Sequence, residues 1–262
     1  MITHFPPLNS VGPRRRRHAG VNARRYHAVP ARSPGLDFPA WEWKEEKDLT
    51  FADRADAGRR LLPLLGELRG QGEITVVGMP RGGIPVAVEI ARALGAPLAV
   101  WVAQRIRAPH RPHLALGAVG EDGDLAFHED VLRKYGISPG YLVDEVRAQR
   151  AEAARRAVLY RRDDAGLEIR GRHVVLVDDG AASGGTLRAA LRGLKHHAPA
   201  SITIAVPVAP QRLVRDISGE GETIHTLTRP LSVSGIGQFY RSFPAVTDPE
   251  VLAALAAEKP AP

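Results

Sequence analysis

Short, mostly apolar runs without polar alternation recur along the chain and are separated by amphipathic stretches. A strand that is apolar at nearly every position must be covered on both faces, which is typical of a parallel sheet flanked by helices. We therefore expect an α/β fold with an open, mainly parallel sheet and helices on both faces. The predicted strands are Ile74–Gly78, Leu98–Ala103, His173–Val177, Ile202–Val208 and Thr223–Leu227.

The stretches between these runs have the spacing of helices. We predict helices over Ile84–Leu94, which ends at Gly95, over Val143–Tyr160 and over Thr186–Leu194. An earlier helix is expected from about Asp53 to Leu68, with Thr50 as its cap and a kink or break at Pro63.

The segment 105–124 breaks this alternation. It is long for a connection between a strand and a helix, and connections of that length are usually functional or disordered. It contains a candidate hairpin formed by Leu114–Val119 and Leu125–His128.

Positive charge is concentrated at the start of the 262-residue chain. The formal net charge is +7, but residues 1–36 hold seven arginines and no acid, so the rest carries 29 basic and 29 acidic side chains. A nucleic-acid-binding domain would carry its charge on the fold. We expect residues 1–40, rich in Arg and Pro, to be a disordered extension, either merely solvated or a basic arm that tethers a nucleic acid or a membrane surface. The domain itself is predicted over 48–257, with a tail at 258–262.

The composition excludes several classes of chemistry. The chain has no cysteine, so disulfides, thiolate metal sites and cysteine nucleophiles are excluded. No apolar run approaches the ~18 residues of a membrane span, and the N-terminus lacks the order of a secretory signal. The expected location is the cytoplasm.

The stretch Val174–Leu187 (VVLVDDGAASGGTL) carries the clearest chemical signal. Its apolar strand ends in Asp178 and Asp179, at the edge where open α/β sheets bind ligands. Glycines and hydroxyl residues follow, and free N–H groups of such a loop at the start of a helix form an anion site. The two carboxylates suit vicinal hydroxyls or a magnesium ion. A ligand with a sugar diol and a terminal phosphate would suit both the carboxylate pair and the anion-binding loop.

Two other nucleotide-binding motifs are excluded. The sequence lacks the lysine of a Walker A loop and the glycine spacing of a dinucleotide loop.

This stretch resembles the 5-phosphoribosyl-1-diphosphate (PRPP) binding motif of type I phosphoribosyltransferases. The resemblance implies that Asp178 and Asp179 bind the 2′- and 3′-hydroxyls of the ribose. It implies that the residues of the following loop hold the 5′-phosphate, namely Gly180, Ala181, Ala182, Ser183, Gly184, Gly185 and Thr186. Ser183 stands where Thr is more usual and keeps the hydroxyl.

Two further segments match the family. Arg81, Gly82 and Gly83 follow the first strand, where the family has its diphosphate loop, and Arg81 would be a bidentate partner of a diphosphate oxygen. Gln104 and Arg105 follow the second strand, where related enzymes often carry Arg-Lys at the start of a flexible catalytic loop. Gln104 removes one positive charge from that pattern, and Arg105 keeps one.

The body from about Phe51 to Leu255 looks like one subgroup of stand-alone predicted phosphoribosyltransferases. The resemblance implies a small hood, built from chain ends, over the acceptor. That hood would comprise the Phe51 region and Gly235–Phe243. Phe239 and Tyr240 could stack on a planar base there, or pack beneath the hood. The features that carry the resemblance are Pro80–Gly83, Ala108-Pro109, Leu116–Val119, Glu129–Val131 and Tyr240-x-x-Phe243.

Four histidines are further candidates. His110 and His113, in the 105–124 segment, could relay a proton or be solvated loop residues. His196 and His197 follow a predicted helix and are better interpreted as partners of its C-terminal dipole than as metal ligands.

The family resemblance implies transfer of ribose 5-phosphate from PRPP to a nitrogen acceptor, a nucleobase or similar heterocycle, with release of diphosphate. Mg²⁺ is the expected cofactor, held mainly through PRPP and not directly by the protein. The alternatives are a PRPP- or nucleotide-binding regulator without transfer activity, and nucleic-acid binding through the basic arm. The family also suggests a homodimer, and no membrane partner is expected.

Overall fold

Parallel strands β2–β1–β6–β7–β8, in that order, form the central sheet in the described part of the chain. In this computed structural model the described residues are 50–68, 70, 72–161 and 167–258. The strands run over Ile74–Gly78 (β1), Leu98–Val100 (β2), His173–Val177 (β6), Ser201–Ala205 (β7) and Thr223–His225 (β8). The predicted open, parallel α/β sheet is thereby confirmed.

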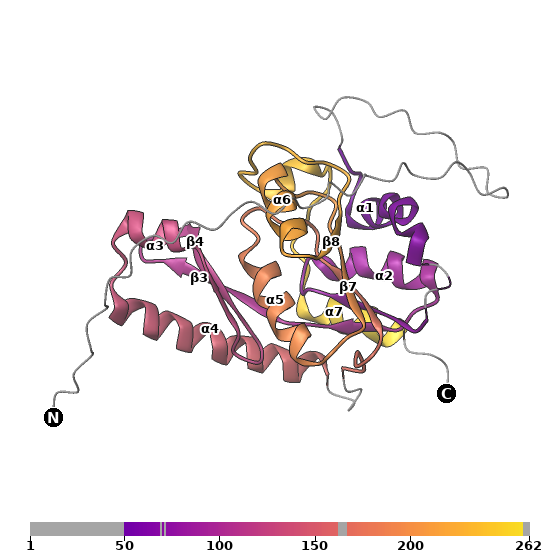
Figure 1. Cartoon of the computed structure of the whole chain (residues 1–262), viewed down its shortest axis with the longest axis horizontal. Coiled ribbons are helices and arrows are strands. Elements are labelled where there is room, and N and C mark those ends of the chain that lie inside the picture. The colour runs from indigo at the N-terminus through magenta and orange to yellow at the C-terminus, as the bar shows by residue number, and fades with distance from the viewer. Residues whose placement is uncertain (1–49, 69, 71, 162–166, 259–262) are drawn as a thin grey trace, which may run out of the picture. The chain divides into compact units, whose positions relative to one another are not determined.

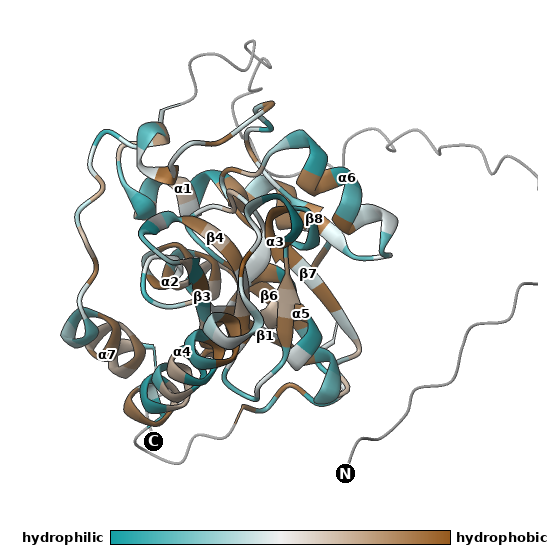
Figure 2. Cartoon of the chain, turned by 90° about the vertical axis from the view of Figure 1, so that its left-hand side faces the viewer, coloured by the Kyte–Doolittle hydropathy of each residue, from teal (hydrophilic) through white to brown (hydrophobic). Residues whose placement is uncertain are grey.

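The sheet is covered on both faces because adjacent residues of each strand point to opposite sides. In β6, Val174 and Leu176 belong to the apolar cluster of α5 (Gly185–His196) and α6 (Gln211–Gly219). Val175 and Val177 belong instead to the cluster of α1 (Arg54–Leu61) and α2 (Gly83–Leu94). This two-sided burial is the physical reason for strands without polar alternation, and Figure 2 shows the hydrophobic colouring of the central strands.

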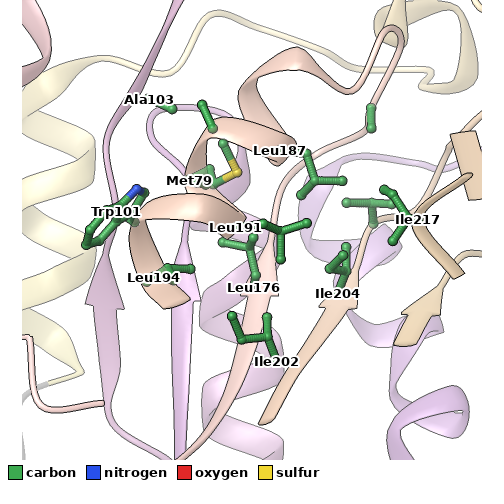
Figure 3. Close-up of a cluster of buried hydrophobic side chains, with 14 of the residues drawn as sticks. Met79, Trp101, Ala103, Leu176, Leu187, Leu191, Leu194, Ile202, Ile204 and Ile217 are labelled. Carbon is green, nitrogen blue, oxygen red and sulfur yellow. The ribbon is translucent and has the colours of Figure 1, made fainter. Parts of the chain in front are cut away.

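Helix α5 supplies much of the larger core. Figure 3 shows Leu187, Leu191 and Leu194 of this helix beside Leu176 of β6 and Ile204 of β7, all of them buried. Burial of each such side chain stabilises the fold by about 1.5–3 kcal/mol. The strand–loop–helix unit that contains Asp178 and Asp179 is therefore anchored at both ends.

The segment 105–124 is an ordered β-hairpin and not an open loop. Strand β3 (Ala103–Ala108) pairs antiparallel with β4 (Arg111–Gly120), which pairs in turn with β5 (Leu125–Phe127). The pairing of β4 with β5 confirms the hairpin predicted from Leu114–Val119 and Leu125–His128. Helix α4 (Pro139–Tyr160) lies along this small sheet (Figure 1) and shares an apolar cluster with it.

Several predicted boundaries are wrong. The strand predicted over Leu98–Ala103 ends at Val100, and Ala103 begins a strand of the second sheet. Asp53 caps α1 by accepting a bond from the Asp56 N–H, so Thr50 is not the cap. The break expected at Pro63 is confirmed, since a 3₁₀ helix, η1, starts at Leu62.

The sequence analysis did not assign four short helices. They are α3 (Glu129–Tyr135), α6 (Gln211–Gly219), the 3₁₀ helix η2 (Ile236–Phe239) and α7 (Asp248–Ala257). None of these helices is longer than about three turns, so the helical spacing of its apolar residues is hard to recognise in the sequence.

The predicted disordered extension, residues 1–40, lies outside the described residues, as do residues 259–262 of the predicted tail. The division into these parts stays a prediction. Within the described ranges, no helix combines the length and the apolar character that crossing a membrane requires.

Gly193 tests the packing of α5. A Cβ atom added there would lie 2.3 Å from Cζ2 of Trp101 and 2.6 Å from Oδ2 of Asp122. We expect Gly193→Ala to lower the free energy of unfolding by about 1–3 kcal/mol, because the indole is fully buried and cannot move aside. Urea denaturation followed by circular dichroism measures this.

Gly219 of α6 is the matched control. It has no atom within 4 Å of an added Cβ. Gly219→Ala should leave the free energy of unfolding unchanged or raise it by up to about 1 kcal/mol. Equal stability of the two variants would show that α5 does not pack against Trp101 as described.

Candidate functional site

Two glycine-containing loops meet at the carboxyl edge of the central sheet. Strands β1 and β6 are parallel neighbours, with Gly78 opposite Val177 at their ends. The loop after β1 contains Arg81 and Gly82, and the loop after β6 begins with Asp178. The strand order reverses between these two strands, which is where open α/β sheets bind ligands. The structure thus brings together two motifs that are nearly a hundred residues apart.

The two loops touch because Gly82 and Gly83 have no side chains. A Cβ at Gly82 would lie 2.0 Å from Oδ2 of Asp179, and a Cβ at Gly83 would lie 2.8 Å from Cα of Asp178. The Met79 N–H also donates to the Val177 carbonyl at 2.8 Å. The peptide bond between Pro80 and Arg81 is cis. Any larger residue at these glycines would separate the diphosphate-loop motif from the carboxylate pair.

The carboxylates of Asp178 and Asp179 lie side by side in a poorly solvated place. The Asp179 N–H donates to Oδ1 of Asp178 at 2.8 Å. Burial raises the pKa of both carboxyls, and the Asp179 charge raises that of Asp178 further. The positive charges of Arg54 and Arg105 act in the opposite direction on both pKa values. The pair is therefore compensated by two cations from other parts of the chain.

Arg54 is a site residue that the sequence analysis missed. Its Nε donates to Oδ2 of Asp179 at 2.9 Å and its Nη1 donates to the Pro244 carbonyl at 2.7 Å. Its guanidinium carbon also lies 3.7 Å from the centre of the Phe243 ring. Arg54 occupies the first turn of α1, where a cation opposes the helix dipole. A cation in this unfavourable position indicates an anionic partner elsewhere in the chain, and this was the sequence signal by which Arg54 could have been found.

The two segments of the predicted hood do pair. The Phe51 N–H donates to the Phe239 carbonyl, and the Arg241 N–H donates to the Phe51 carbonyl, both at 2.8 Å. The ring of Tyr240 is buried between Phe51 and Phe243. Tyr240 therefore packs beneath the hood, whereas Phe239 is half-buried and packs against the same apolar cluster.

The hood is fastened directly to the carboxylate loop. The Tyr240 hydroxyl donates to the backbone carbonyl of Asp179 at 2.7 Å. Ile236 lies against Gly180, where an added Cβ would come within 2.8 Å of its side chain. The Ala181 N–H donates to the Val208 carbonyl at 2.8 Å. These contacts fix the first half of the loop that resembles a 5′-phosphate site.

The second half of this loop leads into α5. Gly184 caps the helix with a φ of 75°, which an L side chain rarely adopts, and Leu213 lies against it. Ser183 is exposed and Thr186 is half-buried, so both hydroxyls lie at the start of the helix and near its surface. Free N–H groups at such a terminus favour an anion.

The remaining predicted basic residues lie on different elements. Arg81 is half-exposed, and its Nη1 lies 3.7 Å from Oδ1 of Asp248, which also accepts from the Tyr160 hydroxyl at 2.6 Å. Arg105 and the half-buried Gln104 lie on β3, not in a flexible loop. Arg105 is exposed, and its charge reaches both carboxylates.

The histidines divide into two groups. His110 and His113 are exposed in the hairpin. His196 and His197 lie at the C-terminal end of α5, where His197 contacts Trp101 edge-on.

His128 was not predicted. Its Nε2 is buried without a partner among the described residues and would lie 3.0 Å from a Cβ at Gly185. Burial lowers the pKa of this imidazole.

The residues present suit magnesium only in part. Asp178 and Asp179 offer the oxygen ligands that Mg²⁺ prefers. In the described part of the chain, however, no three His, Asp or Glu side chains gather into a metal-binding group. Two carboxylates could supply part of the ligand set of a magnesium ion, with water or a bound ligand supplying the rest.

A phosphoribosyl transferase domain model matches residues 54–223 of the chain. Two Mycobacterium tuberculosis proteins, from strains CDC 1551 and H37Rv and both named "Putative phosphoribosyl transferase", are each 39% identical over 205 residues, which is 78% of this chain and 46% of each of them. The chain spans about half the length of these curated relatives. The bifunctional protein PyrR of Pseudomonas entomophila is 34% identical over 107 residues, which is 40% of this chain and 49% of that protein.

Among solved structures, the crystal structure of TT1426 from Thermus thermophilus is similar to this chain with a TM-score of 0.65 and 38% identity. The similarity covers 80% of this chain and 99% of that one.

Tyr240 tests the attachment of the hood. Tyr240→Phe removes the bond to the Asp179 carbonyl and leaves that carbonyl without this partner. We expect the free energy of unfolding to fall by about 1–3 kcal/mol. Urea denaturation measures it.

Tyr141→Phe is the control, because the Tyr141 hydroxyl makes a similar bond, 2.9 Å to the Arg107 carbonyl, at an exposed place. Solvent can replace that bond, so the change should stay within about 0.5 kcal/mol. An equally small effect at Tyr240 would contradict a buried attachment.

Proposed function

Because the chain belongs to the phosphoribosyltransferase family, we propose that it transfers ribose 5-phosphate from PRPP to a nitrogen acceptor and releases diphosphate. The observation that carries this proposal is the contact between the Gly82–Gly83 loop and the Asp178–Asp179 pair. That contact sets a candidate diphosphate site beside a candidate ribose site, the arrangement that C1 of PRPP requires. A nucleobase or related planar heterocycle is the acceptor class that fits a hood lined by aromatic rings.

Each part of PRPP has a matching group in the protein. The loop 180–186 receives the 5′-phosphate at the start of α5. Asp178 and Asp179 accept hydrogen bonds from the ribose hydroxyls. Arg81 and the backbone of Gly82 and Gly83 receive the diphosphate.

The reaction breaks the bond between C1 and the diphosphate oxygen and forms a bond between C1 and the acceptor nitrogen, which loses its proton. Positive charge develops on the ribose and negative charge on the leaving diphosphate. The contribution of the protein is positioning and electrostatic stabilisation, with Arg81 and Arg105 facing the negative charge. No nucleophilic side chain is required.

A magnesium ion bound mainly by PRPP oxygens would act as a Lewis acid and template. Asp178 and Asp179 are the residues that would help to hold such an ion. The hood contacts Asp179, and the charge of Arg105 on β3 acts on both carboxyls. These two elements would limit the access of water to the reacting carbon.

A product screen by mass spectrometry tests this function. The purified chain is incubated with PRPP, Mg²⁺ and a pool of purines, pyrimidines and small nitrogen heterocycles. We expect a new mass equal to acceptor plus ribose 5-phosphate. Binding of PRPP without any product would favour the alternative, a regulator that binds PRPP. Absence of both would overturn the assignment of the carboxylate loop.

Asp179→Asn tests the ribose contact. The change keeps the shape of the side chain but replaces one acceptor oxygen by a donor NH₂ group. We expect turnover to fall by well over tenfold while the circular dichroism spectrum shows that the chain still folds. The melting temperature should fall, because the buried Arg54 loses its charged partner. Unchanged turnover would remove Asp179 from the site.

Arg81→Gln tests the diphosphate contact. Loss of a charge-assisted hydrogen bond of about 1.5–3 kcal/mol predicts a rise of about tenfold to hundredfold in the KM for PRPP. Arg92→Gln is the matched control, because Arg92 is exposed at the end of α2 and pairs with Glu258. A KM that is the same in both variants would contradict a diphosphate role for Arg81.

A further inference from the structure

Arg54 connects helix α1 to two parts of the site that are distant from it in sequence. Its side chain is only 9% exposed, and it joins the Asp179 carboxylate to the Pro244 carbonyl and the Phe243 ring of the hood. A buried cation needs such compensation, since desolvation of an unpaired charge costs several kcal/mol. Arg54 is the first residue of α1, where the helix dipole adds to this cost. The arrangement therefore needs an explanation beyond the folding of α1.

We propose that Arg54 is a positioning residue that orients the Asp179 carboxylate for the ribose and ties the acceptor hood to it. The proposal rests on the proposed function. Arg54 takes up one acceptor site on Oδ2 of Asp179, and the lone pairs of Oδ1 can then accept a hydrogen bond from a ribose hydroxyl. The carboxylate cannot rotate freely while the guanidinium holds it.

The neighbours of Asp179 make this orientation necessary. Gly82 lies so close to Oδ2 that its missing side chain leaves just enough room for the carboxylate. The negative charge of Asp179 and that of the neighbouring Asp178 repel each other. Without the bond from Arg54, the Asp179 carboxylate would be free to turn away from Asp178. That rotation would remove an acceptor from the ribose site.

The second half of the proposal concerns the hood. The guanidinium uses Nη1 for the Pro244 carbonyl and its face for Phe243, in the segment that follows Tyr240. The Tyr240 hydroxyl binds the backbone of the same Asp179. Side chain and backbone of one aspartate are therefore both fastened to the hood. A displaced hood would disturb the ribose contact, and a displaced carboxylate would disturb the acceptor cover.

PRPP binding to the full chain, measured by isothermal titration calorimetry with Mg²⁺ present, tests this role. We compare Arg54→Lys, Arg54→Gln and the control Arg59→Gln. Arg59 lies on the same helix, is 54% exposed and has its Nη1 3.5 Å from Glu89. Lysine keeps the charge but cannot bind Asp179 and Pro244 together in the planar geometry of a guanidinium. Circular dichroism and urea denaturation establish that each variant is folded.

We expect the Kd for PRPP to rise about tenfold or more in Arg54→Gln, less in Arg54→Lys, and not at all in Arg59→Gln. If the screen identifies an acceptor, its KM should rise in the two Arg54 variants as well, because the hood loses its tie. If Arg54→Gln does not fold, the Kd of Arg54→Lys decides, with an expected rise of at least threefold.

Wild-type affinity in folded Arg54→Lys and Arg54→Gln would overturn the proposal and leave the proposed function standing. A wild-type chain that binds PRPP but forms no product would overturn the proposed function, while the Kd series would still decide the role of Arg54. Absence of PRPP binding by the wild-type chain would overturn both.

Discussion

The repulsion between Asp178 and Asp179 is the constraint on which the rest of the site depends. Two adjacent carboxylates at the end of a buried strand lose hydration and oppose each other, and both effects favour the protonated form. The chain answers with cations from two distant elements, Arg54 of α1 and Arg105 of β3. Glycine at position 82 lets the neighbouring loop approach without a side chain between. These cations lower the pKa of both carboxyls and so offset part of the increase that burial causes.

The same constraint explains why the hood is built from both ends of the described chain. Phe51 and Phe239–Arg241 pair through their backbones, and Phe243 and Pro244 then receive the Arg54 side chain. A cation that neutralises Asp179 is held there by aromatic and carbonyl groups. The hood is consequently part of the electrostatic balance of the site.

Sequence reasoning succeeded where structure is local. Strands β1 and β6 have the predicted bounds, and the helix predicted over Ile84–Leu94 starts one residue earlier and ends at the same residue. A buried parallel strand followed by acids and glycines has few alternative conformations. Predictions were wrong where a residue far away in the sequence determines which strand a segment pairs with. By residue type, Ala103 could continue the strand that begins at Leu98. In the structure, the pairing of β2 with β1 in the central sheet ends at Val100, and Ala103 pairs with Gly120 in the second sheet.

The sequence by itself determined the fold class, the carboxylate loop and the family, because buried strands and tight glycine turns leave direct marks in residue type and spacing. Only the tertiary structure decided which charges meet. The residues around Arg54 in the sequence do not indicate that its partner is Asp179, which is 125 positions away. Likewise Tyr240 and Phe239 are both candidates from the sequence, and the packing of the hood buries Tyr240 and leaves Phe239 half-buried. Such pairings depend on the distances between elements in space, which the order of residues does not encode locally.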